Sequence, residues 1–262
     1  MSANAGQSTE DRAMRLALHP LTLCFTGPVA HLEPAFLAHL RAVTGPTVRG
    51  GMILGSVFYT VFIFLDFVVA QGQLRELLLM RFAVVVPMVL GSLLLSYHPR
   101  FAPHLQTIVG LTSVVSGLGI VAMVAVLPED ISRTYYVGLI LVLIFNYTII
   151  RLRFVWASLA GGLMVLAYFV VAIWVVEHSL AILVNNGIFL VAANVAGMTA
   201  SYLFEYWTRR DFHSRHLLQV QRERVAEVNA MLEVRVAERT AALTQSNAEL
   251  EAEMAARHAA TQ

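Results

Sequence analysis

Six apolar stretches separated by short polar breaks occupy most of the first 207 residues. They cover residues 50–70, 77–97, 105–127, 134–150, 154–176 and 180–207. Because a helix of about 20 apolar residues spans the hydrocarbon of a bilayer, this pattern predicts six transmembrane helices. The breaks carry turn-forming residues, as in Gln71-Gly72-Gln73 and His98-Pro99, so neighbouring helices should run antiparallel. We therefore expect an all-α fold, built on a six-helix transmembrane bundle in contact with the lipid bilayer.

From Thr208 onward the pattern changes to a charged chain in which apolar residues recur every seven positions. Two ladders share this spacing: Leu218, Val225 and Leu232, then Val236, Leu243 and Leu250. The second ladder is offset by four residues from the first, which is a stutter that locally unwinds a supercoil. The pattern predicts that the sixth helix continues into a parallel dimeric coiled coil. A single solvated helix is the alternative.

These patterns divide the chain into a lead-in at residues 1–49, a transmembrane sensor or anchor at 50–207, and a signalling helix at 208–262. The lead-in should hold a short extended piece and an amphipathic helix. That helix would lie either on the membrane surface or against the base of the bundle.

Composition and charge narrow the class of protein. A chain that is 58% hydrophobic and 13% charged is not an ordinary soluble domain, and a net charge of +1 gives no basis for nucleic-acid binding. Arginines are distributed unevenly between the two sides of the expected bundle. One side holds Arg41, Arg49, Arg100, Arg151, Arg153, Arg209 and Arg210, whereas the other holds Arg75 and Arg133. Because arginine-rich loops stay in the cytoplasm, we predict that both termini are cytoplasmic.

Three ionisable residues, Asp66, Arg81 and Glu205, lie inside the apolar stretches. Each costs about 2.5–3.5 kcal/mol at the middle of a bilayer and therefore needs a partner. Asp66 and Arg81 lie at similar distances from the adjoining ends of the first two stretches, so antiparallel helices bring them to matching depth. Their ion pair would be either a clasp between two helices or part of a ligand pocket.

Further polar residues are expected at the same depth as this ion pair: Tyr135, Tyr136, Asn185 and Asn186. Polar groups that converge in an apolar cavity are typical of a small-molecule site. Together with the ion pair, these residues form a candidate site for a small hydrophobic or periplasmic ligand.

Glu205 lies near the end of the sixth stretch, level with Arg151 and Arg153 after the fourth. A pairing there would tie the sixth helix to the bundle where the coiled coil begins. These residues are therefore candidates for signal transmission, with plain anchoring of the helix end as the alternative.

Small residues at Ala193, Gly197 and Ser201 form a ladder at four-residue spacing in the sixth stretch. Such ladders let helices approach closely in lipid. The ladder would lie either at a dimer axis or within one bundle.

The sequence contains no nucleophile elbow, phosphate loop, zinc-protease motif or kinase signature, so we expect these residues to catalyse nothing. We also expect no cofactor. The alternative is a haem held between His98 or His104 and a histidine of the tail, since two imidazoles at compatible depth can ligate haem iron.

Short segments in a fixed order carry a family resemblance: Phe25-Thr-Gly-Pro28 with Leu32-Glu33 and Phe36, Phe64-Leu-Asp66, Arg81-Phe82, Tyr135-Tyr-Val-Gly138, Arg151-Leu-Arg-Phe154, and Glu205 with Arg209-Arg210-Asp-Phe212. The chain resembles the six-helix input modules of bacterial receptor-type nucleotidyl cyclases, diguanylate cyclases and histidine kinases. The tail from Leu232 to Thr240 is similar to coils that precede sensor-kinase or PAS regions.

The resemblance implies a homodimeric signalling protein of the bacterial inner membrane. It would pass a conformational change to a cytoplasmic output domain that is absent from these residues. The sequence of the tail, compared with the linkers of these proteins, favours a sensor histidine kinase as the parent protein first, a diguanylate cyclase second and an adenylyl cyclase third. The alternatives are a passive anchor that dimerises an enzyme and a small transporter.

Overall fold

The computed structural model describes residues 16–260, and of residues 253 and 255–260 only the backbone. Within this range the chain is helical and forms no β-strand, which confirms the predicted all-α fold. The elements in chain order are η1 (Gly27–Leu32), α2 (Glu33–Val61), α3 (Ile63–Val69), η2 (Gln71–Gln73), α4 (Leu74–Leu79), η3 (Met80–Val85), α5 (Val86–Tyr97), η4 (Pro99–His104), α6 (Leu105–Val126), α7 (Glu129–Tyr135), α8 (Val137–Ile144), η5 (Phe145–Ile149), α9 (Phe154–Trp174) and α10 (Leu180–Ala260).

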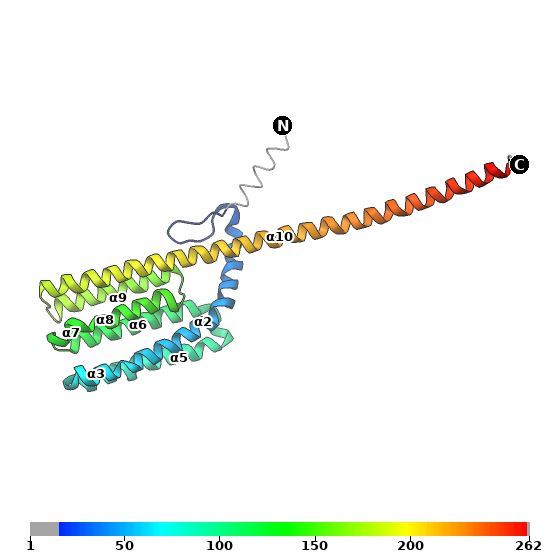
Figure 1. Ribbon diagram of the computed structural model, residues 1–262. Helices are drawn as coiled ribbons and strands as arrows, with labels where there is room; N and C mark the ends of the chain where they lie inside the picture. Colours follow the sequence, from blue (N-terminus) through cyan, green and yellow to red (C-terminus); the bar gives the residue numbers. More distant parts are fainter. Residues whose placement is uncertain (1–15, 261–262) are drawn as a thin grey trace. The chain divides into compact units, whose positions relative to one another are not determined.

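Among the described residues, six helical spans are long and apolar enough to cross a membrane. The first consists of α2 and α3, the second of α4, η3 and α5, and the third of α6; the fourth runs from α7 to η5, the fifth is α9, and the sixth begins α10 (Figure 1). Large apolar side chains such as Phe64, Val68, Leu94 and Leu180 are exposed on these spans. A surface of this kind is stable in hydrocarbon and not in water. The chain is therefore a multi-pass membrane protein in contact with the lipid bilayer.

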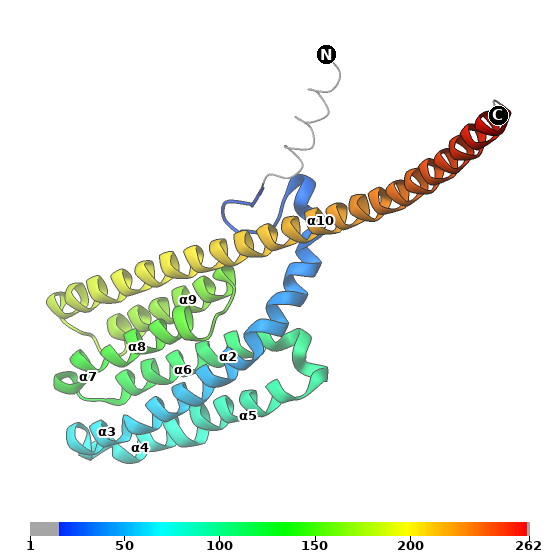
Figure 2. The ribbon, with the colours of Figure 1, turned by 45° about the vertical axis from the view of Figure 1, so that its right-hand side comes forward.

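The first span is longer than the sequence pattern suggests. α2 begins at Glu33, so the helix expected in the lead-in and the first transmembrane helix are one element. Pro46 lies inside α2. Proline has no N–H for the helix and clashes with the preceding turn, so it bends a helix without necessarily ending it. α2 bends along its length (Figure 2).

α6 is the most buried of the six spans. It packs along α9 and also contacts α5, α7, α8 and η3. Close approach to α9 depends on Gly117, because a Cβ there would lie only 2.0 Å from the sulfur of Met164. A larger residue at this position would require the side chain of Met164 to move.

Two of the spans contain a π-helical segment, η3 and η5. Such segments often occur at functional sites, because the wider turn redirects side chains. η3 contains the buried Arg81, and η5 contains the buried Asn146 and Tyr147. The irregular turns thus coincide with polar residues in the interior of the bundle.

The chain divides into two compact units at Arg210 and Asp211, and α10 contributes residues to both. In the second unit α10 is a single helix. The six ladder residues are all at least half exposed: Leu218, Val225, Leu232, Val236, Leu243 and Leu250.

Candidate functional site

A first group of polar side chains, which we call the Arg81 cluster, consists of Tyr59, Asp66, Arg81, Met123 and Tyr135. The Nη2 and Nε atoms of Arg81 donate to Oδ2 of Asp66 at 2.7 and 3.1 Å. The hydroxyl of Tyr135 donates to Oδ1 of the same carboxylate. The predicted ion pair is therefore present, and both of its members are buried, with Asp66 0% and Arg81 1% exposed.

The remaining contacts of Arg81 join further helices to this pair. Its Nη1 donates to the backbone carbonyl oxygen of Tyr59 at 2.6 Å, and its guanidinium lies 4.9 Å from the centre of the Tyr59 ring. Its Nη2 lies 3.9 Å from the sulfur of Met123. Removal of one partner from a buried ion pair costs about 3–5 kcal/mol, because the other charge is left without compensation. The Arg81 cluster therefore holds the first four spans together.

The other residues expected near this ion pair form a separate group. Asn186 donates through Nδ2 to the hydroxyl of Tyr168 at 2.8 Å and to the carbonyl oxygen of Arg133 at 3.1 Å. Tyr136 packs against the ring of Tyr168, and the side chain of Asn185 donates to that of Asn186. A shared depth is therefore not a shared pocket, because these side chains contact one another, Tyr168 and the backbone of Arg133 instead of the ion pair.

A cavity of about 80 Å³ lies among the first four spans. Of the six residues expected to line a ligand pocket, Arg81 borders this cavity, whereas the other five do not. The rest of the wall is mainly apolar and includes Phe58, Ile120 and Phe145.

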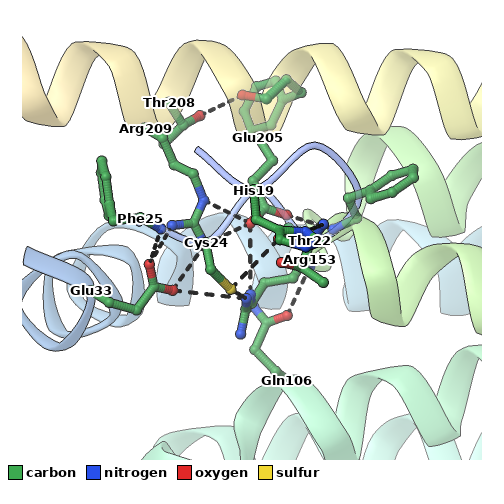
Figure 3. A network of polar contacts seen from close by, with 12 residues as sticks. His19, Thr22, Cys24, Phe25, Glu33, Gln106, Arg153, Glu205, Thr208 and Arg209 are labelled. Carbon is green, nitrogen blue, oxygen red and sulfur yellow. Dashed lines mark hydrogen bonds and ion pairs between the residues drawn. The ribbon is translucent and has the colours of Figure 1, made fainter. Parts of the chain in front are cut away.

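A second polar group lies near the end of the first unit, where α10 carries Glu205 and Arg209 (Figure 3). We call it the Arg209 cluster; it comprises Phe25, Glu33, Phe36, Arg153, Glu205 and Arg209. Arg209 is completely buried. Its Nη1 lies 2.7 Å from Oε2 of Glu33, and its Nη2 lies 2.9 Å from Oε1 of Glu205. One arginine of α10 thus connects the lead-in to a carboxylate one helical turn away.

Arg153 is the second cation of this cluster. Its Nε lies 3.7 Å from Glu205 Oε1, and its Nη2 lies 3.9 Å from Glu33 Oε1. The two carboxylates also accept backbone hydrogen bonds, from Phe25 to Glu33 at 2.9 Å and from Phe154 to Glu205 at 2.6 Å. Two arginines and two glutamates therefore balance in charge, and each carboxylate receives donors from more than one segment.

Aromatic rings complete the enclosure of Arg209. Its guanidinium lies 4.3 Å from the centre of the Phe36 ring and 5.3 Å from that of Phe25, distances at which a cation is attracted to a ring face. Gly27 has φ = 60°, a conformation that favours glycine, and it lies between the segment with Phe25 and the helix with Glu33. The local fold of the lead-in thus brings an aromatic ring and a carboxylate to the same guanidinium.

Of the candidate transmission residues, the structure places Glu205 and Arg153 in the Arg209 cluster. The partner of Glu205 among the two arginines is Arg153, at 3.7 Å, whereas the guanidinium of Arg151 lies 4.7 Å from the centre of the Phe204 ring. Arg151 has φ = 53°, which turns the chain and sends the two neighbouring arginines in different directions. Glu33 and Arg209 were not expected as partners; both occur in the segments that carry the family resemblance, but 176 residues separate them.

The small-residue ladder of the sixth span packs at least partly within the bundle. A Cβ at Gly197 would lie 2.2 Å from Cδ2 of Tyr147, and the hydroxyl of Tyr147 donates to Asn194 at 2.8 Å. Ser201 is buried, whereas Ala193 is half-buried. For Gly197 the structure favours the intramolecular alternative over a dimer axis.

His178 is a buried polar residue in the connection between α9 and α10. It is 5% exposed, and neither of its ring nitrogens has a hydrogen-bond partner. Burial lowers the pKa of this imidazole, and the negative charge of Glu129 partly opposes that effect. The neutral imidazole is therefore the favoured form.

Among the side chains that the structure describes, no group of three from His, Cys, Asp or Glu is arranged to hold a metal ion. Comparison with protein families gave one decisive result: the model of the MASE8 family matches residues 64–219. The chain belongs to the MASE8 family. MASE8 is a family of membrane-associated sensory domains. No curated protein and no solved structure matches the chain.

The part that matches MASE8 contains both members of the Arg81–Asp66 ion pair and the Arg153, Glu205 and Arg209 side of the second cluster. The lead-in, with Glu33, precedes the matched residues. The Arg209 cluster therefore joins a segment outside the MASE8 match to three residues inside it.

Proposed function

We propose that this MASE8 protein is the sensory input module of a homodimeric signalling protein. A ligand or a state of the membrane would favour one packing of the sixth span, and α10 would pass that change to a cytoplasmic effector. The observation that carries the proposal is the continuity of α10, one helix from Leu180 to Ala260 that takes part in the Arg209 cluster before it enters the second unit.

The Arg209 cluster has the features of a two-state element. Arg209 pairs closely with both carboxylates, and Arg153 lies within 4 Å of the same two. A small displacement could therefore exchange one arginine for the other without leaving a charge unpaired. An element with two balanced arrangements can be biased by a remote event, which is the physical basis of a population shift.

The second unit supplies a means of transmitting this bias. Its ladder leaves apolar side chains exposed, and burial of a leucine or valine against a partner helix contributes about 1.5–3 kcal/mol. A parallel dimer would cover the ladder. The stutter after Leu232 is the position at which two registers of such a coil would be closest in free energy.

We place both termini in the cytoplasm of a bacterium, on the basis of the arginine distribution, with the bundle in the inner membrane. The style of the tail supports a sensor histidine kinase as the effector first, then a diguanylate cyclase, then an adenylyl cyclase. A passive dimerising anchor and a small transporter are the competing functions.

A chimera tests the proposal against the passive anchor. Residues 1–262 are joined to a histidine-kinase catalytic core, and autophosphorylation is compared with that of the same core on an unrelated dimeric membrane anchor. We expect Arg209→Leu to change the output several-fold relative to the unaltered chimera, because the substitution removes the ion pairs of Arg209 with Glu33 and Glu205. Equal output from both chimeras and from the anchor fusion would favour the passive anchor, and solute flux in liposomes would favour the transporter.

A further inference from the structure

The cavity among the first four spans has the dimensions of a small ligand site. Its volume is about 80 Å³. Because a water molecule needs roughly 10–15 Å³ on the same scale, the space suits a body of several carbon atoms. Gly55 and Gly138 line it, and the space that their absent side chains leave helps to form the hollow.

The hydroxyl groups in the wall already have hydrogen-bond partners within the protein. Ser113 donates to Asn146 at 2.9 Å, and the hydroxyl of Tyr59 donates to the carbonyl oxygen of Ser116 at 3.2 Å. Among the described residues, no buried polar atom without a partner belongs to the cavity lining. A charged or polyhydroxylated ligand would lose hydration there and gain few hydrogen bonds, which excludes ions, sugars and amino acids.

Arg81 is the charged residue of the lining, and it limits what the ligand can carry. Its Nη1 donates one hydrogen to the Tyr59 carbonyl oxygen and has a second N–H. This second N–H can serve one acceptor, such as a carbonyl or hydroxyl oxygen. A ligand oxygen that accepts this hydrogen bond would contact the Arg81 cluster directly.

The cavity also lies close to the lipid. Phe58 borders it and is 41% exposed on the surface of the bundle. A movement of this ring would open the cavity toward the acyl chains. A ligand could then enter from the lipid without passing through a polar region.

We infer that this cavity binds a small uncharged lipophile with a single oxygen function, an alcohol or ketone in character, that enters from the bilayer. The inference deepens the proposed function, on which it rests, by naming the class of ligand. Occupancy would bring an acceptor to Arg81 and thereby alter the contacts that hold the first four spans together.

Photolabelling of the full chain in lipid nanodiscs tests the site without any signalling readout. The probe is 3-azioctanol, a photoactivatable alkyl alcohol, with 1-octanol as competitor and mass spectrometry of peptides as readout. We expect saturable labelling of the segments with Met52 and Ile120, two buried residues of the lining, with a loss of about tenfold under excess competitor. Labelling that is confined to lipid-facing residues, or that 1-octanol does not compete away, would overturn the inference.

Ser116→Leu fills the cavity with little disturbance, since the Ser116 hydroxyl bonds only within its own helix, at 2.8 Å to Thr112. We expect it to abolish the saturable labelling. Thr199→Leu is the matched control, because Thr199 also bonds within its helix but lies on an exposed face. Gly55→Ala adds a Cβ that would meet Phe145 at an ordinary 3.7 Å, so it fills less of the cavity and should reduce the saturable labelling only in part.

Unchanged saturable labelling in both filled variants would contradict the inference. Altered labelling with unaltered chimera output would support the binding site and count against the proposed function.

Discussion

The two arginine clusters place equally buried guanidinium groups in different electrostatic situations. Arg81 pairs with one carboxylate only 15 residues away, and both side chains are sealed from solvent. Arg209 shares two carboxylates with a second arginine, and its partner Glu33 is 20% exposed and 176 residues distant. The first arrangement gives each charge a single partner, whereas the second gives each charge two.

This contrast indicates what each cluster can do. Removing either member of the Arg81–Asp66 pair leaves a charge in a medium of low dielectric constant, so the pair stabilises the fold. In the Arg209 cluster a displaced charge can turn to another partner or to water, which reduces the penalty for rearrangement. The bundle thus contains one ion pair with a single pairing and one network in which each charge has two partners.

The largest effect is expected from Asp66→Ala, which leaves Arg81 buried without its carboxylate. The free energy of unfolding should fall by about 3–5 kcal/mol, measured by reversible unfolding in mixed micelles. Asp130→Ala, at an exposed acidic residue, is the control and should have little effect. Asp66→Leu combined with Arg81→Met should recover much of the loss, because no charge remains buried; equal behaviour of Asp66→Ala and the control would refute the clasp.

The next effect concerns the second unit, beyond both clusters. Leu232→Asn removes an apolar residue from the exposed ladder and should weaken the proposed dimer by about 1.5–3 kcal/mol for each copy. Analytical ultracentrifugation in detergent measures the dissociation constant. Met231→Asn is a matched control, since Met231 is also exposed but lies off the ladder. A dimer that tolerates both changes equally would show that the ladder is not its interface.

A smaller effect is expected from Glu33→Gln, because Glu205 still supplies a carboxylate to Arg209. Cys24, the single cysteine, is a natural reporter, since its sulfur lies 3.5 Å from Nη2 of Arg153 and it is half-buried. If the substitution lowers the free energy needed to expose Cys24 by ~1.4 kcal/mol, the rate of maleimide labelling should rise about tenfold. Glu233→Gln, in the exposed part of α10, should leave the rate unchanged. A rate in Glu33→Gln equal to that of this control would mean that Glu33 does not hold the lead-in in place.

The smallest effect is a dependence of stability on pH through His178. Because burial lowers the pKa of His178 in the folded state, the unfolded chain binds the proton more readily. Stability should therefore fall as the pH drops below about 6.5, the ordinary pKa of histidine. The midpoint of thermal unfolding from pH 8 to pH 5 gives the slope, and His178→Leu should flatten it. A stability that rises on acidification, or a slope that His178→Leu leaves unchanged, would contradict this assignment.

The sequence pattern predicts the spans well, because long apolar stretches have few alternatives to a membrane helix. It fails at the start of the first span, where the polar stretch around Pro46 has the composition of a break. The structure continues the helix through it. A proline inside a helix costs one hydrogen bond, and tertiary contacts can compensate that loss.

The site residues show where sequence reasoning ends. Depth follows from the position in a span, so the pair of Asp66 and Arg81 could be predicted. The face of a helix does not follow from depth, which is why Tyr136 and Asn185 lie away from that pair. The contact between Glu33 and Arg209 depends on how the lead-in folds back, and no local pattern in the chain encodes it.

The central claim is that the Arg209 cluster sets the state of α10, and disulfide cross-linking in the tail tests it most directly. Single cysteines replace Leu218 or Leu232 in a Cys24→Ser background, and cross-linking between copies is compared with and without Glu33→Gln. We predict that Glu33→Gln changes the ratio of cross-linking at the two positions, because loss of the ion pair with Arg209 removes the link between the lead-in and α10 and thereby shifts the register of the coil. Identical cross-linking at both positions, with and without the substitution, would contradict the account.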